Sequence, residues 1–327
     1  MNLTKRTLLQ GLLAAPALAA PALLLSGANK ASAQTNAPTG QAPGWYRYQV
    51  GDIEITALLD GYTEVPTNFI IGYDENAARE ATANSYHRFV SGPITIPVNA
   101  YVVKTGEETV LLDAGGVAAF FPAAGKLLEN MAASGINPED ITKVLLTHTH
   151  PDHIGALAKE DGGKMFENAS LICSQAEWDF IHSDEVRNAA PEGFRPMIDV
   201  ARVALAPYAD GKQLFSGEKE VLSGITSLPL PGHTPGHTGY IVHSNGDNLL
   251  FWGDVIHFTT LQFANPDWGV AFDADPAMAT QTRRALFERV SADKMAVAGA
   301  HVDFPSIGYV EKSGDAYRYV AAPWMPL

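Results

Sequence analysis

Residues 148–153 read His-Thr-His-Pro-Asp-His, so three imidazoles and one carboxylate fall within six positions. Imidazole nitrogens and carboxylate oxygens are the ligands that zinc and similar divalent ions take in proteins. The alternative is a surface loop that happens to carry four polar side chains. Because the whole chain has only 10 histidines, three of them in so short a segment favour a metal site.

The residues before and after this segment's first histidine indicate how the side chains point. Residues 144–147 (Val-Leu-Leu-Thr) form a short apolar run typical of a buried strand. Side chains alternate along an extended backbone, so His148 and His150 are expected to face the same way. Pro151 suits the first turn of a helix, where its missing N–H costs little. We therefore expect a helix to begin at Pro151, with the next two residues in its first turn.

Four ligand residues cannot complete two metal shells, and three further segments offer the rest. Residues 231–239 form a turn rich in glycine and proline that exposes His233 at its start. Asp254 follows an apolar strand-like run, and His301 follows another. Each residue lies where a strand is expected to end, so each can project into a shared cleft from a rigid scaffold.

Strand-like and helix-like patterns alternate along the chain, which predicts an α/β protein of layered sheets and helices. The pattern alone leaves open a parallel doubly wound sheet or a helix–sheet–sheet–helix sandwich. The strand-like runs are 53–59, 99–104, 109–112, 143–147, 169–173, 239–243 and 248–252, and the helix-like runs are 118–133, 175–181, 197–208 and 276–290.

The complete set of motifs resembles the metallo-β-lactamase superfamily of hydrolases. Within it the chain is most similar to the methyl parathion hydrolase group, relatives of quorum-signal lactonases. The resemblance implies an α/β fold, an αββα sandwich of two mixed sheets flanked by helices, with the site at one edge of the sheets. It covers about residues 44–319 and rests on H-x-H-x-D-H at 148–153, G-H-T-P-G-H at 232–237, G-D at 253–254, a late histidine at 301, and the segments 51–58, 112–115 and 300–305.

The resemblance also implies a role for each matching residue. One metal ion would be bound by His148, His150 and His233, the other by Asp152, His153 and His301, and Asp254 would bridge the two. It implies two divalent ions, with zinc preferred over manganese, cobalt or iron, and a hydroxide between them that attacks the substrate. Residues expected outside the ligand set are His237, which would stabilise its turn, Asp113, which would orient a ligand imidazole, and His87, His182 and His243, which we expect at the surface or in packing.

No side-chain nucleophile is evident, which agrees with metal-dependent hydrolysis. The Gly-x-Ser-x-Gly pattern is absent, and the single cysteine, Cys173, lies in an apolar run where a buried, inert thiol is expected. We predict Asp152, Asp254 and His257 as the catalytic residues. In methyl parathion hydrolase an aliphatic residue aligns with His257 and an aromatic one with Ile181.

The histidine at 257 favours a planar ester or lactone over a bulky phosphotriester, because an imidazole there can hydrogen-bond the former and would crowd the latter. We therefore expect hydrolysis of lactones or aryl carboxylic esters with weaker phosphotriesterase activity, and phosphotriester hydrolysis as the main activity is the alternative. The substrate is expected to be small and apolar or aromatic. Candidate walls of its pocket, with ordinary core packing as the alternative for each, are Phe69, Ile70, Phe120, Phe121, Trp178, Ile181, Phe194, Phe258 and Leu261.

Two other classes of function remain open from the sequence. Iron-dependent oxidoreductases use related sandwiches, but some replace the second histidine of the first motif by an acid, and His150 is intact. A non-catalytic binding protein of the same fold would have lost ligands, whereas all seven positions are filled. The formal net charge of −14 argues against nucleic acid as a partner. Relatives of this kind suggest a homodimer.

The first 33 residues have the features of an export signal. Lys5 and Arg6 precede an apolar run, and Ala31-Ser32-Ala33 is typical of a cleavage site. A membrane anchor is the alternative, and Lys5 departs from the twin-arginine signal that this segment otherwise resembles. We expect a cleaved signal over residues 1–33, a flexible leader over 34–44 and one catalytic domain over 45–327, in a periplasmic or secreted protein without a stable membrane anchor.

Overall fold

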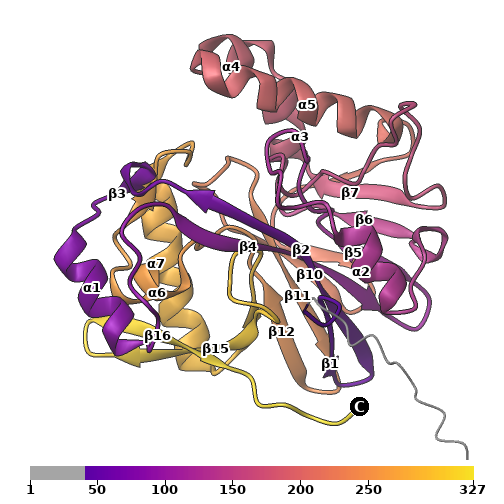
Figure 1. The fold of residues 1–327 in the computed structure, drawn as a ribbon. Coiled ribbons are helices and arrows are strands. Elements are labelled where there is room, and N and C mark those ends of the chain that lie inside the picture. Colours follow the sequence, from indigo (N-terminus) through magenta and orange to yellow (C-terminus); the bar gives the residue numbers. More distant parts are fainter. Residues whose placement is uncertain (1–40) are drawn as a thin grey trace, which may run out of the picture. The chain divides into compact units, whose positions relative to one another are not determined.

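Two seven-stranded β-sheets lie face to face in the computed structural model, which describes residues 41–327 (Figure 1). The first sheet is antiparallel at one side and parallel from β5 onward. Its strands, in spatial order, are β1 (Trp45–Val50), β2 (Ile53–Val65), β4 (Ile94–Lys104), β5 (Thr109–Leu112), β6 (Lys143–Leu145), β7 (Ser170–Ser174) and β8 (Gln213–Phe215).

The second sheet is formed by the C-terminal half of the chain and has one parallel pair, β12 with β14. In spatial order its strands are β16 (Ala316–Ala321), β15 (Ile307–Ser313), β14 (Ala296–Ala298), β12 (Asp247–Phe251), β11 (Thr238–Ser244), β10 (Ile225–Pro229) and β9 (Lys219–Leu222). Two short strands, β3 (Ile70–Ile71) and β13 (Gly269–Val270), pair separately.

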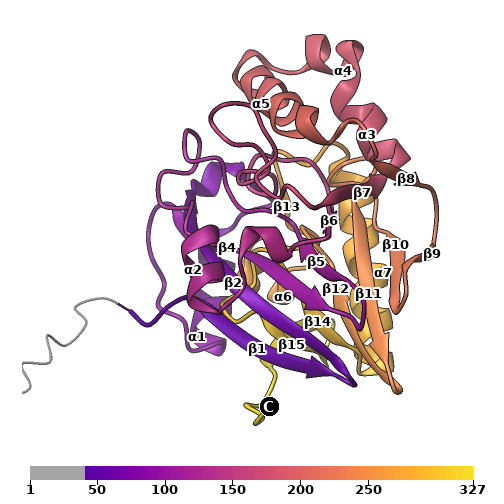
Figure 2. The ribbon, with the colours of Figure 1, turned by 90° about the vertical axis from the view of Figure 1, so that its right-hand side faces the viewer.

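Helices cover the outer faces of both sheets, with α2 on the first sheet and α7 on the second (Figure 2). α3, α4 and α5 follow one another beyond β7 (Figure 1). The helices are α1 (Glu75–Asn84), α2 (Leu127–Ala133), α3 (Gln175–His182), α4 (Asp184–Ala189), α5 (Arg195–Leu205), α6 (Thr259–Ala264) and α7 (Pro276–Asp293).

The strands of the central layers are apolar on both faces, since both faces are covered. In β11, Tyr240 and Val242 pack between the two sheets, whereas Ile241 packs toward α7. In β6, Leu145 points between the sheets and Val144 points toward the outer helices. This alternation of buried side chains produces three core layers between four structural layers. The expectation of an αββα sandwich with two mixed sheets is confirmed.

Two local predictions were wrong. Only the C-terminal part of the helix expected over 118–133 is helical, as α2, because residues 118–126 form turns and irregular structure. The helix expected from Pro151 is replaced by turns. Backbone carbonyls that such a helix would pair internally accept hydrogen bonds from the 114–117 loop instead. The N–H of Val117 bonds the Pro151 carbonyl at 2.9 Å, and the N–H of Ala114 bonds the His153 carbonyl at 2.7 Å. Tertiary contact therefore overrides the local preference.

The predicted export signal and most of the predicted leader lie outside the described residues, so both stay predictions. The first strand begins at Trp45, the residue at which the catalytic domain was expected to start. Between residues 41 and 327 no helix is long and apolar enough to cross a membrane.

Candidate metal centre

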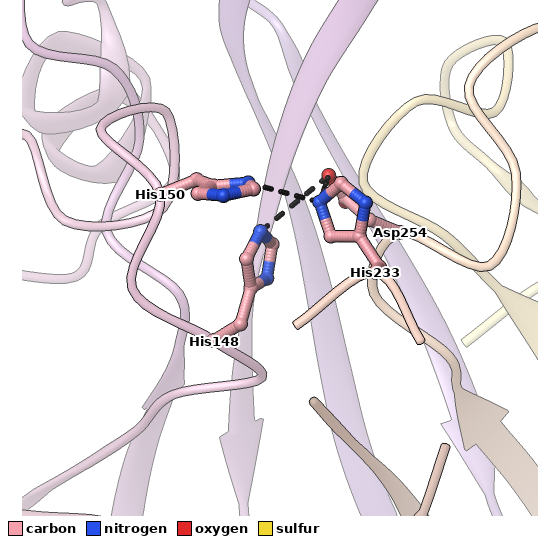
Figure 3. Close-up of side chains that lie close together, drawn as sticks. All are labelled: His148, His150, His233 and Asp254. Carbon is pink, nitrogen blue, oxygen red and sulfur yellow. Dashed lines mark hydrogen bonds and ion pairs between the residues drawn. The ribbon is translucent and has the colours of Figure 1, made fainter. Parts of the chain in front are cut away.

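Histidine and aspartate side chains from both sheets converge on two overlapping clusters. One contains His148, His150, His233 and Asp254, the other Asp152, His153, His301 and again Asp254. The possible ligand atoms within each cluster lie within 4.8 Å of one another. Figure 3 shows the first cluster, with the rings of His148, His150 and His233 directed toward the Asp254 carboxylate. Asp254 thus occupies the shared position that a bridging ligand requires.

Strand ends bring these residues together. The 148–153 segment follows β6 of the first sheet, and His233 lies in the turn between β10 and β11 of the second sheet. Asp254 and His301 follow β12 and β14, the parallel pair, so their loops leave the sheet at the same edge. Ligands that are 83 residues apart in sequence, such as His150 and His233, are therefore only 2.9 Å apart between Nδ1 and Nε2.

The residues at the centre fit divalent ions, because several of their buried nitrogen and oxygen atoms form no hydrogen bond within the protein and can act as metal donors. His148 Nε2, His153 Nε2 and Asp254 Oδ1 are buried and form no hydrogen bond among residues 41–327, although His153 Nε2 and Asp254 Oδ1 lie 3.2 Å apart as an ion pair. Leaving such atoms unpaired costs free energy unless another group satisfies them. Nitrogen and carboxylate donors in this mixture suit zinc and its neighbours in the first transition series. The clusters therefore fit a binuclear divalent metal site.

Three partners orient the ligand imidazoles through the ring nitrogen that faces away from the centre. His153 Nδ1 lies 2.8 Å from Asp113 Oδ2, and His233 Nδ1 lies 2.8 Å from Asp273 Oδ1. His301 Nδ1 donates to the carbonyl of Pro97 at 2.8 Å. Each contact leaves Nε2 pointing to the centre, as is usual for histidine ligands. Asp113 therefore contacts the ring of His153, one of the predicted ligands.

Burial and charge act in opposite directions on the titration of these residues. Burial lowers the pKa of His148 well below its ordinary value and that of His150 to about 3, so both rings are neutral. Burial also disfavours charge on His301, but Asp254 and Asp152 outweigh it and raise the pKa to about 10. Because metal binds the neutral imidazole, an ion bound at His301 would displace a proton from its ring.

His257 lies beside the centre and lines a cavity of about 200 Å³. Its Nε2 atom is 3.2 Å from Asp254 Oδ2, while its buried Nδ1 atom has no partner in the described part of the chain. Burial lowers the pKa of His257 to about 4. His301 forms another part of the cavity wall. The apolar residues around the rest of the cavity include Phe89, Ile94, Ile96, Phe258 and Leu261.

Of the nine residues predicted to line the pocket, Phe258 and Leu261 border this cavity. Ile70 shares a packed core cluster with these two residues but does not border the cavity, and Ile181 lies in a different core cluster. His87 was expected at the surface and is exposed, but it also borders the cavity and pairs with Asp303 at 3.1 Å.

The remaining histidines and the cysteine have structural environments. His237 accepts the Asp254 N–H at 3.0 Å, and its other ring nitrogen contacts the carbonyl of Leu230 at 3.0 Å, which stabilises the turn as expected. His182 and His243 are exposed. Cys173 is buried, and burial raises the pKa of its thiol to about 12, so it is a poor nucleophile.

Several supporting residues were not found from the sequence. The Asn99 amide donates to the carbonyls of Ala300 and Val302, at 3.0 and 2.8 Å, and so holds the loop that carries His301. Buried Arg283 in α7 donates to the carbonyl of Val255 at 2.8 Å and thereby holds the loop before His257. A buried polar residue in an otherwise apolar strand was the available signal for Asn99.

Comparison with known proteins identifies the family. Residues 94–301 match the model of the metallo-beta-lactamase superfamily. The chain belongs to this superfamily, and together with the paired metal clusters this makes it a metal-dependent hydrolase.

Similar proteins include lactonases. An N-acyl homoserine lactonase of Bacillus sp is 25% identical over 228 residues, which cover 64% of this chain and 82% of that protein. One from Bacillus cereus is 24% identical over 227 residues, with the same coverage. Among solved structures, a hydrolase of the beta lactamase superfamily, AbOPH, is 30% identical with a TM-score of 0.82, covering 88% of this chain and 100% of that one. AidC, a dizinc quorum-quenching lactonase in complex with an N-acyl homoserine product, is 25% identical with a TM-score of 0.79, covering 86% and 99%.

Proposed function

We propose that this protein is a lactonase, which opens the ring of lactones that carry an apolar substituent and also acts on aryl carboxylic esters. The observation that carries the proposal is the cavity beside the metal centre, whose wall includes both His257 and His301. A substrate seated there has its apolar part among aromatic and aliphatic side chains and its carbonyl next to the ligands. The lactonase relatives support the same substrate class.

We assign the metal ligands as the sequence predicted. His148, His150 and His233 would hold one ion, Asp152, His153 and His301 the other, and Asp254 would contact both. Ions bound there would supply a Lewis acid for the substrate carbonyl and a water molecule acidic enough to react near neutral pH. Zinc is the ion that we propose first, since AidC contains two zinc ions.

The protein's own residues orient the substrate and exclude water. Because Asp254 is a carboxylate, the Nε2 atom of His257 at 3.2 Å donates to it, which leaves Nδ1 of the neutral ring as an acceptor. An acceptor at this place suits a substrate N–H, which an N-acylated lactone offers and a phosphotriester does not. The apolar wall formed by Phe258 and Leu261 excludes water from the substrate's side chain.

Asp152 and Asp254 are the groups that can take part in proton transfer. Both carboxylates are buried against histidines, and Asp152 Oδ2 lies 3.3 Å from His301 Nε2. Asp152, the more exposed of the two acids, is ionised, so we assign it to accept the proton that the attacking water loses and to pass that proton to the leaving alkoxide of the opened lactone.

Rates with three substrate classes test the proposal. The full-length protein, loaded with zinc, manganese or cobalt, is assayed with N-acyl lactones, aryl esters and paraoxon-like phosphotriesters. We expect the highest kcat/KM for a lactone. A higher kcat/KM for the phosphotriester would reverse the assignment in favour of a phosphotriesterase, and no turnover with any metal would favour a binding protein.

A further inference from the structure

Glu177 lies in the first turn of α3, outside every motif that carries a predicted ligand, and is buried. Its Oε1 atom accepts hydrogen bonds from the N–H of Thr149 at 2.9 Å and from the hydroxyl of Thr149 at 2.7 Å. Its Oε2 atom accepts from the hydroxyl of Thr234 at 2.6 Å. Thr149 separates the first two histidines of the 148–153 segment, and Thr234 directly follows His233. One carboxylate thus connects the two loops that carry one half of the metal centre.

The start of α3 is a firm anchor for this connection. Ser174, the last residue of β7, accepts the Glu177 N–H at 3.1 Å and donates its hydroxyl to the carbonyl of Gly236 at 2.8 Å. A Cβ atom at Gly236 would lie only 2.1 Å from the Glu177 nitrogen. The 233–236 turn therefore packs with its backbone directly against the helix, and Glu177 cannot move independently of either element.

We propose that Glu177 is a positioning residue that sets the separation between His233 and the pair His148 and His150, and thereby the metal affinity of that half of the centre. The two loops extend from different sheets, and His150 and His233 are 83 positions apart in the chain, so local structure imposes no constraint on their distance. Three donors on one buried carboxylate supply that constraint, and they also offset the cost of burying its charge. The inference rests on the proposed metal-dependent function.

The other half of the centre depends on different contacts. Asp113 orients His153, and Asn99 holds the loop that carries His301. None of the hydrogen bonds of Glu177 reaches these residues. Loss of Glu177 should therefore weaken one metal equivalent and spare the second.

A purely local role in the helix makes a different prediction. An acidic side chain in the first turn stabilises any helix through its dipole, and Glu185 also lies in the first turn of its helix, α4, but is exposed. If Glu177 acted only in this way, its replacement would change the stability of the protein but not the release of metal. Glu185→Ala is accordingly the matched control.

The experiment titrates a metal chelator against the zinc-loaded full-length protein and measures the release of each metal equivalent. For Glu177→Ala we expect one equivalent to leave at a chelator concentration about 10–100-fold lower than in the wild type. The second equivalent and all of Glu185→Ala should behave as in the wild type. Glu177→Gln should fall closer to the wild type, because glutamine still accepts from Thr149 and can donate to Thr234. Asn99→Ala, which releases the loop that carries His301, should weaken the equivalent that Glu177→Ala spares.

Three results would overturn the proposal: wild-type release from folded Glu177→Ala, equal weakening of both equivalents, or a glutamine variant as weak as the alanine variant. If Glu177→Ala does not fold, Thr234→Val removes only one of the three bonds and should weaken the same equivalent by a smaller factor; unchanged release from that variant also overturns the proposal. A wild-type protein that binds fewer than two equivalents would instead contradict the proposed function, so the two failures are distinguishable.

Discussion

The imidazole rings of His257 and His301 stack, with centroids 5.2 Å apart and planes at 21° to each other. His301 is a predicted metal ligand, and His257 reaches the shared carboxylate of Asp254 through Nε2. Both rings border the cavity. A substrate in the cavity therefore meets the proposed orienting residue and the metal centre side by side.

Replacing His257 by leucine should change substrate preference. His257→Leu removes the proposed acceptor for a substrate N–H and leaves more space in the cavity for a tetrahedral phosphorus centre. We expect kcat/KM for an N-acyl lactone to fall about 10–100-fold, as for loss of one or two hydrogen bonds, while that for a paraoxon-like triester holds or rises. His243→Leu, at an exposed histidine of β11, is the control. An unchanged ratio of the two activities would show that His257 does not discriminate.

Removal of metal should abolish hydrolysis and destabilise the protein. Bound ions would satisfy the buried ring nitrogens of His148 and His153 and the buried oxygen of Asp254, which form no hydrogen bond among residues 41–327. Free metal at a hundred times its Kd should stabilise the fold by about 3 kcal/mol, measured as a rise in Tm on adding zinc to chelator-treated protein. Two equivalents should restore activity. Full activity after complete chelation would refute the assignment of a metal-dependent hydrolase.

Asp113→Asn should lower metal affinity about 10-fold to 100-fold. The variant removes the negative charge that faces His153 Nδ1 at 2.8 Å, and asparagine can present an amide donor toward the same ring. Metal content after dialysis and kcat at saturating zinc measure the effect separately. Asp161→Asn, at an exposed acid, should change neither. Recovery of wild-type kcat at saturating zinc is the expected result, because Asp113 acts through the ligand and not on the substrate.

A larger side chain at position 261 should restrict the enzyme to substrates with shorter acyl chains. Leu261 is buried and borders the cavity, so Leu261→Trp removes part of its volume. We expect kcat/KM for long acyl chains to fall at least about 10-fold relative to short ones, at a cost of about 1–3 kcal/mol in stability. Val203→Trp, at an exposed position of α5, is the control. Equal losses for all chain lengths would mean that the substrate's chain lies elsewhere.

Arg283→Met should destabilise the fold by about 2–4 kcal/mol. The buried guanidinium donates to the carbonyls of Val255, Pro266 and Trp268 at 2.8–2.9 Å, and methionine leaves all three unpaired. Urea unfolding measures the change. Arg289→Met, at an exposed arginine of the same helix, should stay within about 0.5 kcal/mol of the wild type. A similar result for both variants would contradict the role of Arg283 in holding the 255–268 segment, which includes α6.

Much of the candidate site could be predicted because its chemistry is local in sequence. His148 and His150 lie two residues apart after an apolar run, and their rings do converge, with centroids 4.7 Å apart. The predicted backbone conformation around His153 was wrong, because turns that are hydrogen-bonded to the 114–117 loop replace the expected helix after Pro151. The preference of one proline for a helix start stabilises the local conformation less than several backbone hydrogen bonds to a neighbouring loop do.

The sequence by itself predicted the candidate ligand residues, from residue type, short spacing and the family resemblance, and it predicted the layered α/β architecture from the alternation of apolar side chains. Only the tertiary structure decided which side chains support the centre and which line the cavity. Glu177, Asp273 and Asn99 act on residues tens to hundreds of positions away, at 28, 40 and 201 residues from a partner. Contacts at such separations leave no periodic pattern in the chain, because packing of the two sheets brings them together.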